Sequence, residues 1–281
     1  MAQDFCAILL WGGLAYLAFL VPHPLSVQLL KSSKRWITLA TLILYCATLA
    51  ILPLEAASLG EGWSEAVTVS TLHDVLFETN IGSSWICQSV AALGLFLAAL
   101  VLSNRMKLQA CLAGLFLSTH ILIGHAVMLE GPEGTVLQAN YLMHVLAAGA
   151  WVGALLPVFF LMHRMAGHPS PDHVTALQRF SRAGHAAVAI TILSGLLNAL
   201  LIRGRLLPVA SSPYDNLLTL KVILVVLMVS LALFNRYGLL AQVTTSRRAA
   251  QLLRAFTLAE FGLALLVLVV VNLFGTLNPH V

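Results

Sequence analysis

Long apolar runs recur along the whole chain and limit what it can fold into more than any other feature. Several approach the ~20 residues that a helix needs to cross the hydrocarbon core of a bilayer. Of the 281 residues, 59% are hydrophobic and only 9% are charged, and the mean hydropathy is +0.92. A soluble domain of this size needs far more charge to cover its surface. The sequence therefore predicts an all-α, polytopic membrane protein.

Eight apolar segments predict a bundle of about eight transmembrane helices within a single integral membrane domain that covers residues 1–281. Each segment ends near charge, glycine, proline or a polar cluster, as helix ends do. The predicted segments are Phe5–Val21, Ile37–Pro53, Trp85–Leu102, Leu108–Leu129, Ala139–Met162, Gly184–Ile202, Leu217–Phe234 and Phe256–Phe274.

The loops between these segments alternate in charge, and only the sixth, with Arg203, Arg205 and Asp215, blurs the contrast. The odd loops carry Lys31, Lys34, Arg35, Arg105, Lys107, Arg164, Arg179, Arg182, Arg236, Arg247, Arg248 and Arg254. The second and fourth loops carry Glu55, Glu61, Glu65, Asp74, Glu78, Glu130 and Glu133. The positive-inside rule then places the odd loops in the cytoplasm and both termini in the periplasm. The formal net charge of +4 is spread among loops, so we expect no nucleic-acid partner. In the second loop we expect a short helix.

Histidines and methionines gather near the predicted outer ends of the fourth and fifth segments. His125 lies about one turn from the end of the fourth segment, and His144 about one turn from the end of the fifth. A short loop joins these segments, so we expect the two imidazoles at the same level. His120 lies ~7.5 Å deeper than His125 at 1.5 Å per residue. Met128 is one turn outward from His125, and Met143 adjoins His144.

Imidazole and thioether donors near the outer surface favour copper as the bound metal ion. Cu(I) is favoured over Cu(II), because Cu(I) suits both donor types. His73, in the second loop, is a further candidate ligand. The alternative is that these histidines and methionines have structural roles. Methionine often fills gaps in cores, and a histidine near the membrane interface can form a hydrogen bond with a neighbouring residue. Ionisable groups inside a membrane are expensive and tend to mark functional sites, which favours a functional role for His125 and His144.

The stretch "GAWVG", from Gly149 to Gly153, has a small-residue spacing that permits close helix approach. In the same helix, His144 shares a face with Ala148 and Trp151. We therefore expect His144 to face a neighbouring helix and not lipid.

Two other ionisable residues lie inside predicted helices. Lys221 either snorkels to the interface or meets a carboxylate or water in a substrate pathway. We expect Glu260 to pair with Arg182, Arg236 or Arg254.

Several stretches together resemble the CopD copper-resistance family of bacterial inner-membrane proteins. The similarity is strongest over residues 120–281, whereas the N-terminal half resembles the family in hydropathy. One departure is "PYDN", at Pro213–Asn216, where the family more often has Tyr-Gly. The similar stretches are "GHA" (124–126), "HVLAAGAWVGALLP" (144–157), "FSRAGHAAVAITILSGLLNA" (180–199), "SPYDNLLTLKVILVVLMVSLALFNR" (212–236) and "AEFGLALLVLVVVNLFGTLNP" (259–279).

The resemblance implies a multi-pass inner-membrane protein that moves copper from the periplasm towards the cytoplasm. It also implies a small periplasmic copper carrier of the CopC type as a partner. The resemblance implies that His125, in "GHA", and His144, in the segment with Trp and Gly, are the leading site residues. We expect no catalytic residues and no enzymatic activity.

The main alternative is a haem-binding, cytochrome-b-like electron carrier. It would pair His125 or His120 with His144 on the outer side, and His163 with His185 on the inner side. His144 and His163 lie ~28 Å apart along one helix, which puts His163 at the inner membrane surface and disfavours an inner haem. A single outer haem stays open, as does a membrane scaffold whose histidines are all structural. We prefer copper.

Overall fold

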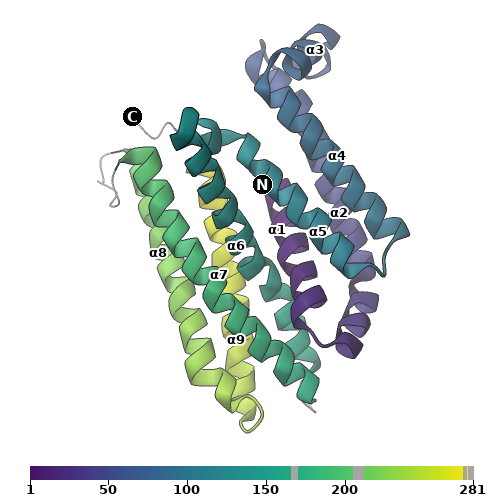
Figure 1. Cartoon of the computed structure of the whole chain (residues 1–281), viewed down its shortest axis with the longest axis vertical. Helices are drawn as coiled ribbons and strands as arrows, with labels where there is room; N and C mark the ends of the chain where they lie inside the picture. The colour runs from purple at the N-terminus through teal and green to yellow at the C-terminus, as the bar shows by residue number, and fades with distance from the viewer. Residues whose placement is uncertain (166–169, 205–211, 275–276, 278–281) are drawn as a thin grey trace.

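The computed structural model describes residues 1–165, 170–204, 212–274 and 277, except the side chains of His125, Ala126 and Phe274. These residues form helices and no strands, which confirms the all-α prediction. The α-helices are α1 (Ala2–Ala15), α2 (His23–Leu59), α3 (Val69–Glu78), α4 (Asn80–Val101), α5 (Met106–Ser118), α6 (Gly131–Arg164), α7 (Pro171–Arg203), α8 (Pro213–Phe234) and α9 (Arg247–Phe274) (Figure 1).

Within the described residues, seven helical segments are long and apolar enough to cross a membrane. They are α2, α4, α6, α7 and α9, together with α1 extended to Leu20 and α8 extended to Gln242. A shorter apolar segment, Met106–Leu122, contains α5. The predicted polytopic bundle is therefore confirmed, with one predicted span shorter than expected.

That shorter span corrects the predicted fourth segment, Leu108–Leu129. The α-helix ends at Ser118, and two 3-10 turns follow at Thr119–Leu122 and Gly124–Val127. Ile123, between the two turns, adopts an extended conformation with φ −135° and ψ 161°. Gly124 then adopts a left-handed φ of 65°, which breaks the helix.

Three helices are much longer than the apolar runs that predicted them. α2, α6 and α7 contain 37, 34 and 33 residues. The basic residues of the expected first loop, Lys31, Lys34 and Arg35, lie inside α2. Lysine, arginine and glutamine are good helix formers, so the helix continues through them. The helices α2, α6, α7 and α8 each begin with proline in the first or second position, where its missing N–H costs nothing.

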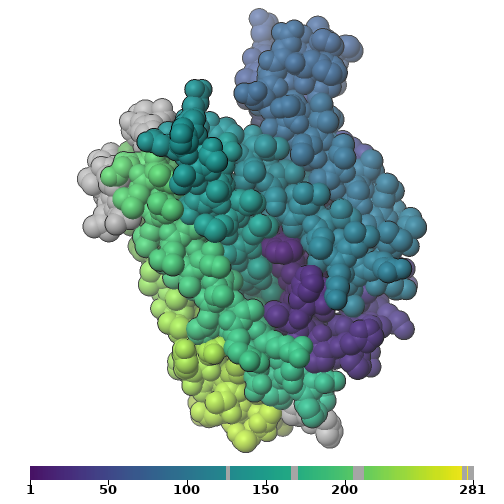
Figure 2. Space-filling view, viewed as in Figure 1, coloured from purple at the N-terminus to yellow at the C-terminus, as the bar shows by residue number. Residues whose placement is uncertain are grey.

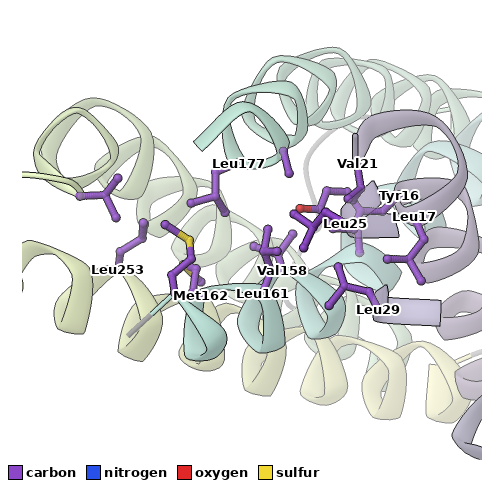
Figure 3. Close-up of a cluster of buried hydrophobic side chains, with 14 of the residues drawn as sticks. Tyr16, Leu17, Val21, Leu25, Leu29, Val158, Leu161, Met162, Leu177 and Leu253 are labelled. Carbon is purple, nitrogen blue, oxygen red and sulfur yellow. The ribbon is translucent and has the colours of Figure 1, made fainter. Parts of the chain in front are cut away.

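α1 occupies the centre of the bundle and packs against α2, α5 and α6. Figure 1 shows α2, α4 and α5 on one side of α1, and α6 to α9 on the other. In the second group α6 packs on α7 and α9, and α8 packs on α9. The largest buried cluster joins the end of α1 and the start of α2 to α6, α7 and α9 (Figure 3).

Outward-facing positions of the long helices stay apolar. Val101 in α4 is 77% exposed, Leu193 in α7 is 67% exposed, and Val226 in α8 is 57% exposed. Such surfaces are suited to contact with lipid chains. The predicted short helix of the second loop is present as α3, which projects from one end of α2 and α4 (Figures 1 and 2). Val75 of α3 is buried against Leu52 and Ala56 of α2.

Candidate functional site

A polar cluster surrounds the first turn of α1, inside an otherwise apolar bundle. The amide of Gln3 donates to Thr48 Oγ1 at 3.3 Å and to Gln88 Oε1 at 3.0 Å, which joins α1 to α2 and α4. The next residue, Asp4, faces His120 from the turn that follows α5. Buried polar groups of this kind need their hydrogen bonds satisfied from within the protein.

His120 is held by Asp4. Its Nε2 lies 3.1 Å from Asp4 Oδ1, while Asp4 Oδ2 lies 2.9 Å from the amino group of Met1. The imidazole and the ring of Phe116 pack in a T-shaped arrangement, with ring centroids 5.9 Å apart. Because the carboxylate accepts the proton on Nε2, the neutral ring has its lone pair on Nδ1. That Nδ1 atom is buried and has no hydrogen-bond partner among the described residues.

His144 is held by α7 in a similar way. Its Nδ1 lies 3.1 Å from the carbonyl oxygen of Thr191 and 3.0 Å from Ser194 Oγ. The Ser194 hydroxyl donates its own hydrogen to the carbonyl of Ile190, so its oxygen accepts from the ring. The proton of the neutral ring is therefore on Nδ1, and the lone pair is on Nε2. This contact confirms that His144 faces a neighbouring helix.

Three further residues, from α6, α7 and α8, complete the surroundings of His144. One turn before His144, Asn140 donates to the carbonyl of Ser194 and to Asn198 Oδ1, both at 2.8 Å. Gly195 leaves room for the ring, since a Cβ atom there would lie 3.3 Å from His144 Cε1. Lys221 of α8 is partly buried and within electrostatic range of His144.

The depth expected for the histidines was counted from the predicted outer ends of the fourth and fifth segments, and both of these ends differ in the structure. α6 begins at Gly131, eight residues before the predicted Ala139, so His144 lies ~20 Å along the helix from its first residue. His120 and His125 both lie in 3-10 turns rather than in a continuous α-helix. The side chain of His125 lies outside the described residues. The common level expected for His125 and His144 therefore stays a prediction.

The other predicted ligands lie on exposed surfaces. Met128 and Met143 are 41% and 54% exposed. His73 is on α3, 3.5 Å from Asp74 and against the ring of Phe77. No group of three or more histidine, cysteine, aspartate or glutamate side chains that could hold a metal occurs in the part of the chain that the structure describes.

At the other end of the bundle, His163 and His185 have separate partners. Arg254 contacts His163 Nδ1 at 3.3 Å. His185 bonds the carbonyl of Ser181 at 2.8 Å and the hydroxyl of Tyr237 at 3.2 Å. To bind an inner haem, as the cytochrome-b-like alternative requires, His163 would have to break its contact with Arg254, and His185 its contacts with Ser181 and Tyr237.

Glu260 does not pair with arginine as expected. Within the described residues it forms no ion pair, and it accepts a hydrogen bond of 2.5 Å from Asn235 Nδ2. Arg236 instead donates to Ser181 Oγ at 2.6 Å, and Arg254 contacts His163.

The polar partners of the histidines, Asp4, Thr191 and Ser194, were not predicted, and neither was Asn140, which donates to Ser194 and Asn198. A helical signal was present in α7, where the polar residues recur three and four positions apart and share one face. Those residues are Thr191, Ser194 and Asn198. No sequence pattern pairs Asp4 with His120, because 116 positions separate them.

Comparisons with known proteins agree with one another. Residues 1–135 match a family described as copper resistance protein D-like, N-terminal domain, and residues 174–274 match copper resistance protein D. The chain is 34% identical to the inner membrane protein YebZ of Escherichia coli, over 97% of this chain and 94% of YebZ. It is 32% identical to copper resistance protein D of Pseudomonas syringae, over 82% of this chain and 78% of that protein.

A third relative is the copper transport protein CutJ of Bacillus subtilis, with 29% identity over 90% of this chain and 47% of CutJ. No solved structure matches the chain.

Proposed function

Since the chain belongs to the copper resistance protein D family of the inner membrane, we propose that it moves copper ions from the periplasm across that membrane. The ion is Cu(I), and the principal ligands are His144 Nε2 and His120 Nδ1. His125, Met128 and Met143 supply further donors on the outer side. His73 captures the ion in the acidic second loop, to which a periplasmic carrier of the CopC type delivers it.

The observation that supports this proposal most directly is the orientation of the two imidazoles. In each, one nitrogen is held by an acceptor, namely Asp4 for His120 and the Thr191 carbonyl for His144. Histidines that bind metals in proteins usually donate their other ring N–H to a carboxylate or a backbone carbonyl in this way. Neutral imidazole nitrogens are also suitable ligands for copper.

The test is metal analysis of the protein purified in detergent, beside its visible spectrum. We expect a colourless protein that retains near-stoichiometric Cu(I) and loses most of it in His144→Ala and in His120→Ala. The matched control is His163→Ala, which removes an imidazole that contacts Arg254 at the other end of the bundle. This control should retain its copper.

Two outcomes would overturn the proposal. A Soret band that disappears in His144→Ala would identify a haem ligand in place of a copper ligand. Copper content that is equal in all four proteins would leave both histidines with structural roles only. The two single variants also separate one shared ion from two. With one shared ion, each single variant loses all bound copper, whereas with two separate ions each single variant keeps one of two equivalents.

Direction is tested in proteoliposomes with Cu(I) supplied under reducing conditions. We expect uptake only from the face that carries α3, and a loss of uptake in His144→Ala. Uptake from the opposite face alone would reverse the proposed direction.

A further inference from the structure

A cavity of about 260 Å³ lies between α6, α7, α8 and α9. On α6 it begins at Trp151, ~10 Å along the helix from His144. Most of its wall is apolar, with Trp151, Phe180, Ile192 and Val229 among the lining residues. Pockets with mostly apolar walls and a few convergent polar groups are typical of sites for organic ligands.

The polar groups of the cavity include a buried amide oxygen that lacks a hydrogen-bond donor, and a carboxylate that accepts from a single side-chain amide. Glu260 is 3% exposed and Asn235 is 7% exposed, and both line the cavity. Asn235 Nδ2 donates to Glu260 Oε1, which fixes the amide orientation and leaves Asn235 Oδ1 as the acceptor. Oδ1 is buried and has no partner among the described residues. An occupant that donates hydrogen bonds would satisfy these groups, whereas an anionic head group would be repelled by the carboxylate.

The nearby cation does not change this requirement. Arg236 also lines the cavity, but it donates to Ser181 Oγ and stacks on the ring of Tyr237, 5.5 Å from its centroid. The Arg236 guanidinium therefore already has a hydrogen-bond acceptor and an aromatic contact within the protein. Asn235 Oδ1 and the Glu260 carboxylate remain as acceptors for an occupant.

The cavity lies between two helix pairs, since α7 packs mainly on α6, and α8 packs mainly on α9. Two residues of its wall, Ile192 on α7 and Leu233 on α8, are 39% and 46% exposed. In Figure 1 the helices α7 and α8 run alongside each other on one flank of the bundle. An apolar tail can therefore leave the cavity between α7 and α8 and enter the lipid.

We propose that this cavity binds a lipophilic hydroquinone. Its hydroxyl groups donate to Asn235 Oδ1 and to the carboxylate of Glu260, its ring packs on the apolar wall, and its isoprenoid tail passes between α7 and α8. Ubiquinol and menaquinol share this chemistry. The inference is independent of the copper site, because it uses none of the residues around His120 and His144.

The test has two measurements on the full-length protein in detergent. Solvent extraction followed by mass spectrometry identifies the quinone that copurifies and separates ubiquinone from menaquinone. Anaerobic titration with decylubiquinol, followed by quenching of tryptophan fluorescence, gives the affinity. The protein should show saturable binding, and Glu260→Gln should bind about tenfold more weakly. Ala232→Phe, which fills the cavity from α8, should abolish binding.

Glu133→Gln is the matched control, because Glu133 is an exposed carboxylate in the first turn of α6. It should bind decylubiquinol like the unaltered protein. If Glu260→Gln does not fold, decylubiquinol binding by Ala232→Phe alone tests the proposal. Equal binding in folded Ala232→Phe, or copurified phospholipid with no saturable decylubiquinol binding, would overturn the proposal.

Discussion

Gly12 of α1 and Gly153 of α6 lie so close that a Cβ atom on Gly12 would be 2.7 Å from Gly153 Cα. The same atom would be 2.3 Å from the carbonyl oxygen of Gly149. The two backbones are therefore in direct contact, which confirms the close approach predicted from "GAWVG" and identifies α1 as the partner. This crossing fixes the height of α1 against α6, and with it the position of Asp4 relative to His144.

Gly12→Ala tests this crossing. The added methyl group cannot be accommodated without moving one backbone, and overpacking of this kind typically costs about 1–3 kcal/mol. We expect a lower Tm in detergent. Gly94→Ala is the control, because a Cβ atom on Gly94 meets nothing within 4 Å, and its Tm should not fall. An unchanged Tm in Gly12→Ala would contradict the close packing of α1 on α6.

Gly195→Leu tests whether the orientation of His144 matters for copper. A side chain at this position meets His144 Cε1 at 3.3 Å, so the ring must leave its contacts with Thr191 and Ser194. We expect loss of most bound copper by metal analysis, although His144 is retained. Gly262→Leu, at a position with open space around it, should keep its copper. Full copper content in Gly195→Leu would mean that the orientation is irrelevant.

The sequence predicted the helices better than their ends. Apolar runs locate the parts of each helix that face lipid, but α2 and α6 continue into polar segments whose residues also favour helix. The fourth predicted span was too long, because an extended Ile123 and a left-handed Gly124 interrupt the helix inside an apolar run.

The candidate site was predicted only in part. His144 and its contact with a neighbouring helix follow from the helical spacing, and the contact is confirmed. The partners were not predictable, because hydrogen bonds such as Asp4 to His120 depend on how α1 and α5 pack. The expected pairing of Glu260 with arginine was wrong: among the described residues the carboxylate accepts from Asn235, directly after α8, and forms no ion pair.

Lys221→Met tests the electrostatics of the proposed copper site. The ammonium group lies within electrostatic range of His144, and like charges repel more strongly in a low-dielectric interior. Removing this charge should raise the affinity for Cu(I), by roughly tenfold if the repulsion costs about 1.4 kcal/mol. Competition with a chromogenic Cu(I) chelator measures the affinity. Weaker binding in Lys221→Met would show that Lys221 supports the site.

Charge alternation among the loops predicts the orientation, and cysteine labelling tests it. In a variant with the four native cysteines replaced, Ser64→Cys places an exposed thiol between α2 and α3, and Thr245→Cys places one between α8 and α9. A membrane-impermeant maleimide applied to spheroplasts should label position 64 at once. Position 245 should react only after the membrane is disrupted. The reverse pattern would place both termini in the cytoplasm.

The ion pair between Arg203 and Asp215 joins the end of α7 to the start of α8, and its two side chains are 7% and 1% exposed. The Arg203 guanidinium also lies 5.0 Å from the centroid of the Tyr214 ring. Removing one partner of a buried pair leaves an uncompensated charge and typically costs about 3–5 kcal/mol, whereas replacing both by apolar residues is often neutral. Arg203→Met should therefore lower the Tm in detergent markedly, and Arg203→Met with Asp215→Leu should recover much of the loss. If the double variant is less stable than the single one, Asp215 stabilises the protein through its other contacts rather than through Arg203.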